Sequence, residues 1–133
     1  IDELGLRDHV TFLPALSAQE VRNELMHANV YCLASTMENS PNSLCEAQMT
    51  GTPAVATRVG GVEDLVTDGE TGFVVPPRDP DALAEAILKI FQMGPKQAEK
   101  MTDGAYKAAA RRHDPQNIVH DVVEAYRAVE GKK

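Results

Sequence analysis

Two glutamates with seven residues between them, Glu38 and Glu46, are the side chains whose spacing best suits chemistry on a ligand. Glu38 falls in a polar loop, and Glu46 falls one turn inside the short helix that follows. Backbone amides at a helix N-terminus attract phosphate, and a carboxylate accepts hydrogen bonds from sugar hydroxyls. The spacing therefore suits a nucleotide sugar, with one acid on the ribose and the other on the hexose. The alternative that spacing alone leaves open is two solvated surface acids, with Glu46 stabilising only its own helix.

The start of that helix supplies further candidate contacts. Asn42 and Ser43 are compatible with a helix N-terminus, and Leu44 follows them. Their backbone amides would point outward without intrahelical partners, in the place where a phosphate would bind.

A second candidate place lies shortly afterwards, at Gly60-Gly61. Glycines without a side chain let the backbone approach a ligand closely. The neighbouring Arg58 could meet a diphosphate. An ordinary tight turn and a surface arginine are the alternative, and these residues taken alone favour it.

Four short apolar runs predict the strands of a sheet, and capping and breaking residues predict helices between them. Ser17 with Glu20 is a capping-box pattern, and Asp79-Pro80 is an N-cap followed by proline at the first helical position. The expected strands are 10–13, 30–33, 53–57 and 72–75. The expected helices are 17–27, 43–49, 62–66, 80–93, 96–113 and 116–130.

Unbroken apolar strands that alternate with helices predict an α/β fold, a Rossmann-like parallel sheet with helices on both faces. In such sheets ligands bind where strands end and helices begin. Both candidate places meet that condition. The length of 133 residues allows one domain and not two full ones, and four strands make a small sheet, so we expect a single truncated domain over 1–133.

Composition excludes several classes of protein. A net charge of −7 argues against a nucleic-acid partner. The four histidines have no metal-ligand spacing, so no metal site is expected. Two cysteines indicate reduced thiols rather than a disulfide framework, and Cys32 within an apolar run is expected to be a small buried residue. The expected location is the cytoplasm, with peripheral attachment to the inner membrane face as an option for a full-length protein.

The stretch 37–66 resembles the donor-site signature of the retaining GT-B glycosyltransferase family that includes sucrose synthases and bacterial mannosyltransferases. That signature has two glutamates seven residues apart, then alanine, a small-residue turn, a proline-initiated apolar strand and Gly-Gly before an acidic helix. Matching residues continue downstream through the expected strand at 72–75. The positions in register are Glu38, Glu46, Ala47, Gly51, Thr52, Pro53, Val55, Ala56, Gly60, Gly61, Glu63 and Val66.

The resemblance implies roles for individual residues. Glu38 would be the catalytic-site acid that contacts the transferred sugar, and Glu46 would hold the ribose. Amides around Asn42, Ser43 and Leu44 would face the sugar and diphosphate. The loop after the expected strand 10–13, at Pro14, would contact the base.

The resemblance also implies a reaction. The family transfers a sugar from a nucleoside diphosphate to an acceptor hydroxyl with retention, and normally needs no metal or other cofactor. The acceptor would be a glycan, a lipid or a small molecule. Cationic residues that bind the diphosphate, and the N-terminal acceptor domain, are absent from these residues, so we expect a partial C-terminal GT-B domain that is inactive by itself.

Departures and alternatives remain at this point. Residues 39–42 replace the family's common aromatic and glycine, and Pro41 has no amide hydrogen to donate. The alternatives are a non-catalytic flavodoxin-like binding or regulatory module and a GT-B sugar-nucleotide epimerase. A sheet lacking upstream strands would also expose an edge, which predicts association through that edge.

Overall fold

Helices and strands alternate along the chain, as the apolar runs predict. The computed structural model describes residues 1–130. It contains two short 3₁₀ helices, six α-helices and three strands. In chain order the elements are η1 Asp2–Leu4, η2 Arg7–His9, α1 Ala18–His27, β1 Tyr31–Leu33, α2 Asn42–Thr50, β2 Ala54–Thr57, α3 Val62–Leu65, β3 Phe73–Val75, α4 Pro80–Gln92, α5 Pro95–His113 and α6 Pro115–Glu130.

The sheet is parallel, with the order β1-β2-β3. Tyr31 pairs with Ala54 across β1 and β2, and Val55 pairs with Phe73 across β2 and β3. All three carboxyl ends therefore meet at one edge. This arrangement confirms the predicted parallel α/β sheet.

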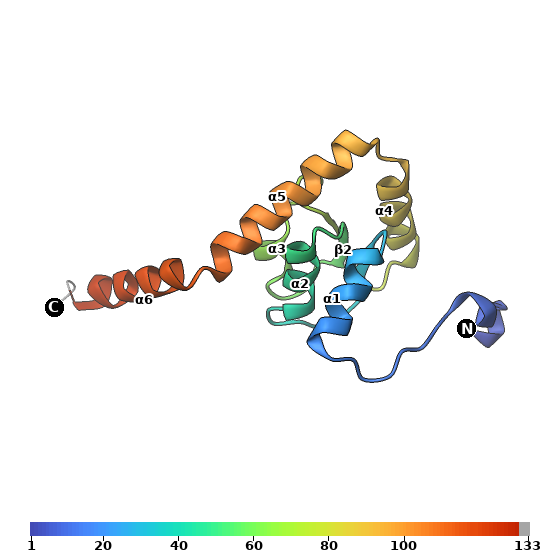
Figure 1. Ribbon diagram of the computed structural model, residues 1–133, viewed down its shortest axis with the longest axis horizontal. Coiled ribbons are helices and arrows are strands. Elements are labelled where there is room, and N and C mark those ends of the chain that lie inside the picture. The colour runs from blue at the N-terminus through green and yellow to red at the C-terminus, as the bar shows by residue number, and fades with distance from the viewer. Residues whose placement is uncertain (131–133) are drawn as a thin grey trace.

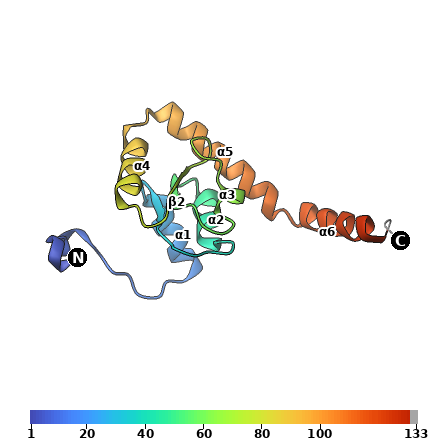
Figure 2. The same ribbon diagram turned by 180° about the vertical axis from the view of Figure 1, so that it is seen from behind.

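Helices cover both faces of the sheet, as predicted (Figures 1 and 2). On one face, α2 and α3 contribute Leu44, Val62 and Leu65 to a buried cluster with Ala54 and Ala56 of β2. On the other face, α4 packs against β2 and β3. Helices α1 and α5 form an outer layer on α2. The sheet thus has helices on both faces, which is the arrangement of a Rossmann-like domain.

Local signals in the sequence explain where the helices start and end. Ser17 and Glu20 form the predicted capping box at the start of α1. Asp79 caps α4 by accepting a hydrogen bond from the Ala82 amide, and Pro80 begins that helix. Gly51 ends α2 in the left-handed conformation, with φ of 77°.

The prediction of a strand at 10–13 was wrong. These residues are exposed and lie in the segment that runs from η2 to α1, so the described sheet has three strands rather than four. A strand forms only where a neighbour takes up its backbone hydrogen bonds. An apolar β-type run alone does not supply that neighbour.

The prediction that Cys32 is buried was also wrong. Cys32 pairs with Val55, so its side chain lies on the sheet face that α4 covers. Helix α4 makes its main sheet contacts with β2 and β3, whereas β1 lies at the edge farther from α4. The Cys32 side chain therefore stays exposed although it belongs to an apolar run.

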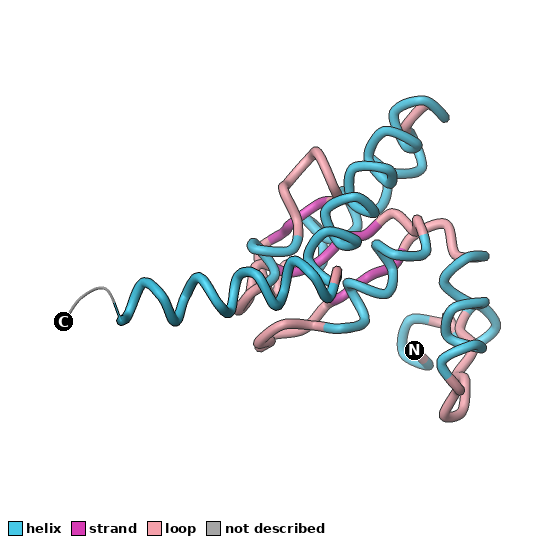
Figure 3. Tube along the Cα trace, turned by 60° about the vertical axis from the view of Figure 1, so that its left-hand side comes forward, coloured by secondary structure: helices cyan, strands magenta, loops and turns pink. Residues whose placement is uncertain are grey.

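Both ends of the chain extend from the layered body (Figure 1), and the extension of α6 is visible again in Figure 3. Residues 1–15 are exposed throughout, and α6 contains no buried residue within its bounds. The large apolar side chains exposed on this helix are Ile118, Val119, Val122, Val123, Tyr126 and Val129. No helix among residues 1–130 has the length and apolar character to span a membrane.

Candidate functional site

The two candidate places predicted from the sequence meet at the carboxyl ends of β1 and β2. The Gly61 amide donates a hydrogen bond to the Asn39 carbonyl over 2.8 Å. Gly60 has a φ of 52°, and a methyl group on it would overlap the Glu38 carbonyl oxygen. The close approach that these glycines permit is thus to the Glu38–Asn39 backbone. The structure joins the Gly-Gly turn to the loop that carries the first glutamate.

Glu38 is held in place by its own loop. The Ser35 hydroxyl donates to Glu38 Oε1 over 2.6 Å, so one carboxylate oxygen already has a protein partner. The Thr57 hydroxyl, at the end of β2, donates to the Ser35 carbonyl. The glutamate is consequently connected through Ser35 to a buried strand end and does not depend on a flexible loop for its position.

The first turn of α2 presents exposed polar groups beside Glu38. Pro41 is the N-cap residue and supplies no capping side chain. Asn42 and Ser43 are exposed at the start of the helix. Leu44 differs from them, because its amide donates to the Pro41 carbonyl over 3.2 Å and its side chain is completely buried. Of the three predicted phosphate contacts, Asn42 and Ser43 are therefore the better placed.

Glu46 is exposed on α2 and lines a cavity of about 300 Å³ between α1 and α2. Val21, Arg22 and Leu25 of α1 line the same cavity. The cavity combines an apolar floor with one acid and one base. Such a lining suits a ring with hydroxyl groups.

Tyr31 of β1 contacts the first turn of α2, close enough to Glu38 and Glu46 to be influenced by their charges. Its hydroxyl donates to Ser43 Oγ over 2.7 Å. Burial raises the pKa of Tyr31 above its ordinary value, and the negative charges of Glu38 and Glu46 act in the same direction. The phenol therefore keeps its proton at neutral pH.

The two other predicted contacts lie differently. Arg58 is exposed and forms an ion pair with Glu63 of α3. Both side chains of this ion pair are exposed to water, and an exposed ion pair is weak. Pro14 lies in the exposed segment before α1. Its predicted contact with a base stays a prediction.

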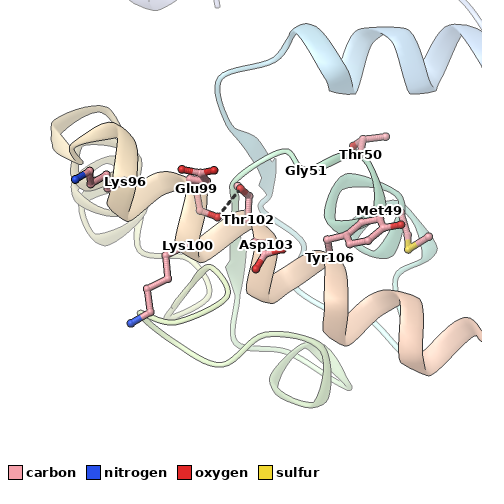
Figure 4. A pocket seen from close by; sticks show the side chains of 9 residues that line it. All are labelled: Met49, Thr50, Gly51, Lys96, Glu99, Lys100, Thr102, Asp103 and Tyr106. Atoms are coloured by element: carbon pink, nitrogen blue, oxygen red, sulfur yellow. Dashed lines mark hydrogen bonds between the residues drawn. The ribbon is translucent and has the colours of Figure 1, made fainter.

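A separate cavity of about 770 Å³ lies between the end of α2 and the first half of α5 (Figure 4). Lys96, Lys100, Glu99 and Asp103 bring both signs of charge to its lining. None of the predicted ligand-contact residues lines it, although Gly51 of the family signature does. Among residues 1–130, no cluster of three or more His, Cys, Asp or Glu side chains could hold a metal ion.

Sequence reasoning did not single out Tyr31, Ser35 or Thr57, which the structure places at the site. Neighbouring residues of a strand point to opposite faces of the sheet. Tyr31 and Cys32 do so, and Tyr31 lies on the face that α2 covers. Ser35 and Thr57 are small polar residues directly after apolar runs. That position at a strand's carboxyl end is the available signal.

The fold and the site together define a Rossmann-like domain whose candidate ligand groups gather at the carboxyl edge of its sheet. The family model described as glycosyl transferases group 1 matches residues 1–108. The chain belongs to this family. The match does not favour the flavodoxin-like module or the epimerase as alternatives.

Curated and solved relatives agree with this assignment. The D-inositol 3-phosphate glycosyltransferase of Corynebacterium urealyticum is 34% identical over 128 residues, which cover 96% of this chain and 30% of that protein. The sucrose-phosphate synthase structure from Thermosynechococcus elongatus has a TM-score of 0.84 and 30% identity, covering 99% of this chain and 33% of that one. Anabaena HepE in complex with UDP has a TM-score of 0.83 and 27% identity, covering 96% and 34%. The chain thus spans about a third of the length of these relatives.

Proposed function

We propose that these residues form the donor-binding side of a retaining glycosyltransferase that moves a sugar from a nucleoside diphosphate to an acceptor hydroxyl. The observation that carries the proposal is the joining of the Glu38 loop, the first turn of α2 and Gly60-Gly61 at one edge of the sheet. The family match and the UDP complex of a relative of the same fold support it.

The geometry gives each group a chemical task in this proposal. Glu38 accepts hydrogen bonds from hydroxyls of the transferred sugar, with Ser35 fixing one of its carboxylate oxygens. Glu46 accepts from the ribose, at the cavity between α1 and α2. The diphosphate lies at the first turn of α2, where the amides of Asn42 and Ser43 and the helix dipole stabilise its charge.

Departure of the diphosphate is the step that this site would assist. Negative charge grows on the leaving oxygen as the anomeric bond breaks, and fixed dipoles aimed at that charge lower the barrier. We propose that no metal or resident cofactor takes part. The chain covers only 30% and 33% of the two relatives named first above. The proposal therefore assigns only the donor side to these residues and leaves the acceptor, whether glycan, lipid or small molecule, to the rest of a longer protein.

Location belongs to the same proposal. We propose the cytoplasm for the full-length protein, with peripheral contact at the inner membrane face if its acceptor is a lipid. The two free thiols agree with a reducing compartment.

The test is an amide NMR titration of this chain with the diphosphate sugars of uridine, guanosine and adenosine. We expect localised shifts at 38–46 and 60–61 with one of the three, at a Kd on the order of 1 mM. The variants Glu38→Gln and Glu46→Gln should each weaken binding about fivefold, because each loses a charged acceptor.

The matched control is Glu70→Gln. Glu70 is exposed in the turn before β3, so it lies at the amino ends of the strands, away from the proposed site. The variant should bind as the unaltered chain does. A folded sample without shifts for any of the three donors would contradict the donor site. Retention is checked on the enzyme that carries these residues, by the anomeric coupling constant of its product, and an inverted product would contradict it.

A further inference from the structure

Tyr31 and Ser43 connect the edge strand β1 to the first turn of α2. The Tyr31 hydroxyl donates to Ser43 Oγ over 2.7 Å. Tyr31 is partly buried, whereas the Ser43 residue is exposed. A serine hydroxyl has one hydrogen to donate and two lone pairs to accept with. Because Ser43 Oγ accepts from Tyr31, its own hydrogen is left to donate away from the phenol.

That hydrogen joins other donors at the same turn. Pro41 leaves the first turn of α2 without a capping side chain. The backbone amides of Asn42 and Ser43, which lie next to the Ser43 hydroxyl, therefore have no capping side chain as acceptor and can donate to a ligand. Hydrogen bonds in a chain polarise one another, so an anion that accepts from Ser43 also strengthens the bond from Tyr31. A neutral phenol is needed for this, and a tyrosine with its ordinary pKa of 10.0 or above is protonated at neutral pH.

We infer that Tyr31 is a positioning residue for the donor diphosphate, because it turns the Ser43 hydroxyl hydrogen toward a phosphate oxygen at the first turn of α2. The inference rests on the proposed donor site and deepens it. It assigns to Ser43 a side-chain contact in addition to the backbone contact expected from the family resemblance. It also explains why a tyrosine hydroxyl is placed under the helix start, where a phenylalanine would fill the same space.

The test is a double-mutant cycle on binding of UDP, GDP and ADP to this chain, followed by NMR. We expect Tyr31→Phe to weaken the best of these ligands about fivefold, and Ser43→Ala about tenfold. The double variant should bind no more weakly than Ser43→Ala alone, since Tyr31 acts through Ser43. Ser43→Thr, which keeps the hydroxyl, should retain the sensitivity to Tyr31→Phe.

The matched control is Tyr106→Phe, which removes a phenol hydroxyl from α5 and should leave binding unchanged. A purely structural role for Tyr31 would give a different result. Tyr31→Phe would then weaken binding by the same factor with or without the Ser43 hydroxyl, and that outcome would overturn the inference while the donor site stands. Failure of the unaltered chain to bind any of the three diphosphates at millimolar concentration would overturn the donor site and the inference together.

Discussion

At the scale of residues, the site depends on a contact between two backbone segments that are far apart in sequence. Gly60 packs directly against the Glu38 carbonyl, and Gly61 donates to Asn39. Local patterns singled out both segments as candidate ligand contacts, and for Gly60-Gly61 the family resemblance, not the residues alone, supported that role. Their mutual packing could not be predicted, because no local signal relates Gly60 to Glu38. The glycines are explained by this packing before any ligand is considered.

Substitution of Gly60 by alanine should therefore damage the fold as well as the site. The added methyl group would overlap the Glu38 carbonyl, and the residue would keep a left-handed φ of 52°. We expect a loss of about 3 kcal/mol in the free energy of unfolding, measured by urea denaturation.

The matched control for Gly60→Ala is Gly69→Ala. Gly69 also has a positive φ, of 76°, but no atom lies near the position of its added methyl group. Its cost should be the backbone strain alone, about 1 kcal/mol. Equal losses for the two variants would show that packing against Glu38 contributes nothing.

At the scale of elements, helix boundaries followed the sequence more closely than strands did. Pro80 begins α4 as predicted, and Pro95 and Pro115 begin α5 and α6 one residue before the predicted starts at 96 and 116. Each effect is local to its own helix. The strand predicted at 10–13 failed because strand pairing requires a partner from elsewhere in the chain. The prediction that Cys32 is buried failed for the same reason, since its burial depends on whether its strand lies at an edge of the sheet.

The capping box of α1 gives a prediction at this scale. Ser17→Ala should cost about 1 kcal/mol at neutral pH, because it removes the N-cap acceptor for the Glu20 amide. It also removes a hydrogen-bond partner of the Glu20 carboxylate. The side-chain hydrogen bond from Ser17 lowers the pKa of Glu20 below its ordinary value of 4.5. A lowered pKa in the folded state stabilises the fold above the unfolded-state pKa, and this contribution is lost as pH falls through the folded-state pKa.

The stability difference between the unaltered chain and Ser17→Ala should consequently shrink in acid, below about pH 4. Urea denaturation at pH 7 and at pH 3 measures it. Gln97→Ala is the control, since Gln97 is exposed in the first turn of α5 and caps nothing. A difference that stays constant across this range would show that the Glu20 carboxylate does not contribute through Ser17.

At the scale of the whole molecule, the described residues leave apolar surface and a sheet edge uncovered. Strand β1 is at the edge, and the exposed side chains of α6 and of residues 1–13 add apolar area. Unpaired strand edges and large apolar patches promote association between chains. The two relatives named first above are about three times longer, and their additional residues can contact the corresponding surfaces. For the chain of 133 residues, the physical expectation is association through the β1 edge.

A charge on that edge should reduce the association. Cys32 is exposed on β1, and Cys32→Lys places an ammonium group where a second chain would pair. We expect sedimentation velocity to show concentration-dependent association of the unaltered chain, and a mainly monomeric Cys32→Lys variant with a similar free energy of unfolding. Ala84→Lys adds the same charge on the exposed side of α4 and should associate as the unaltered chain does. Equal effects of the two lysines would indicate net charge rather than the edge, and a monomer with a concentration-independent melt would contradict the association itself.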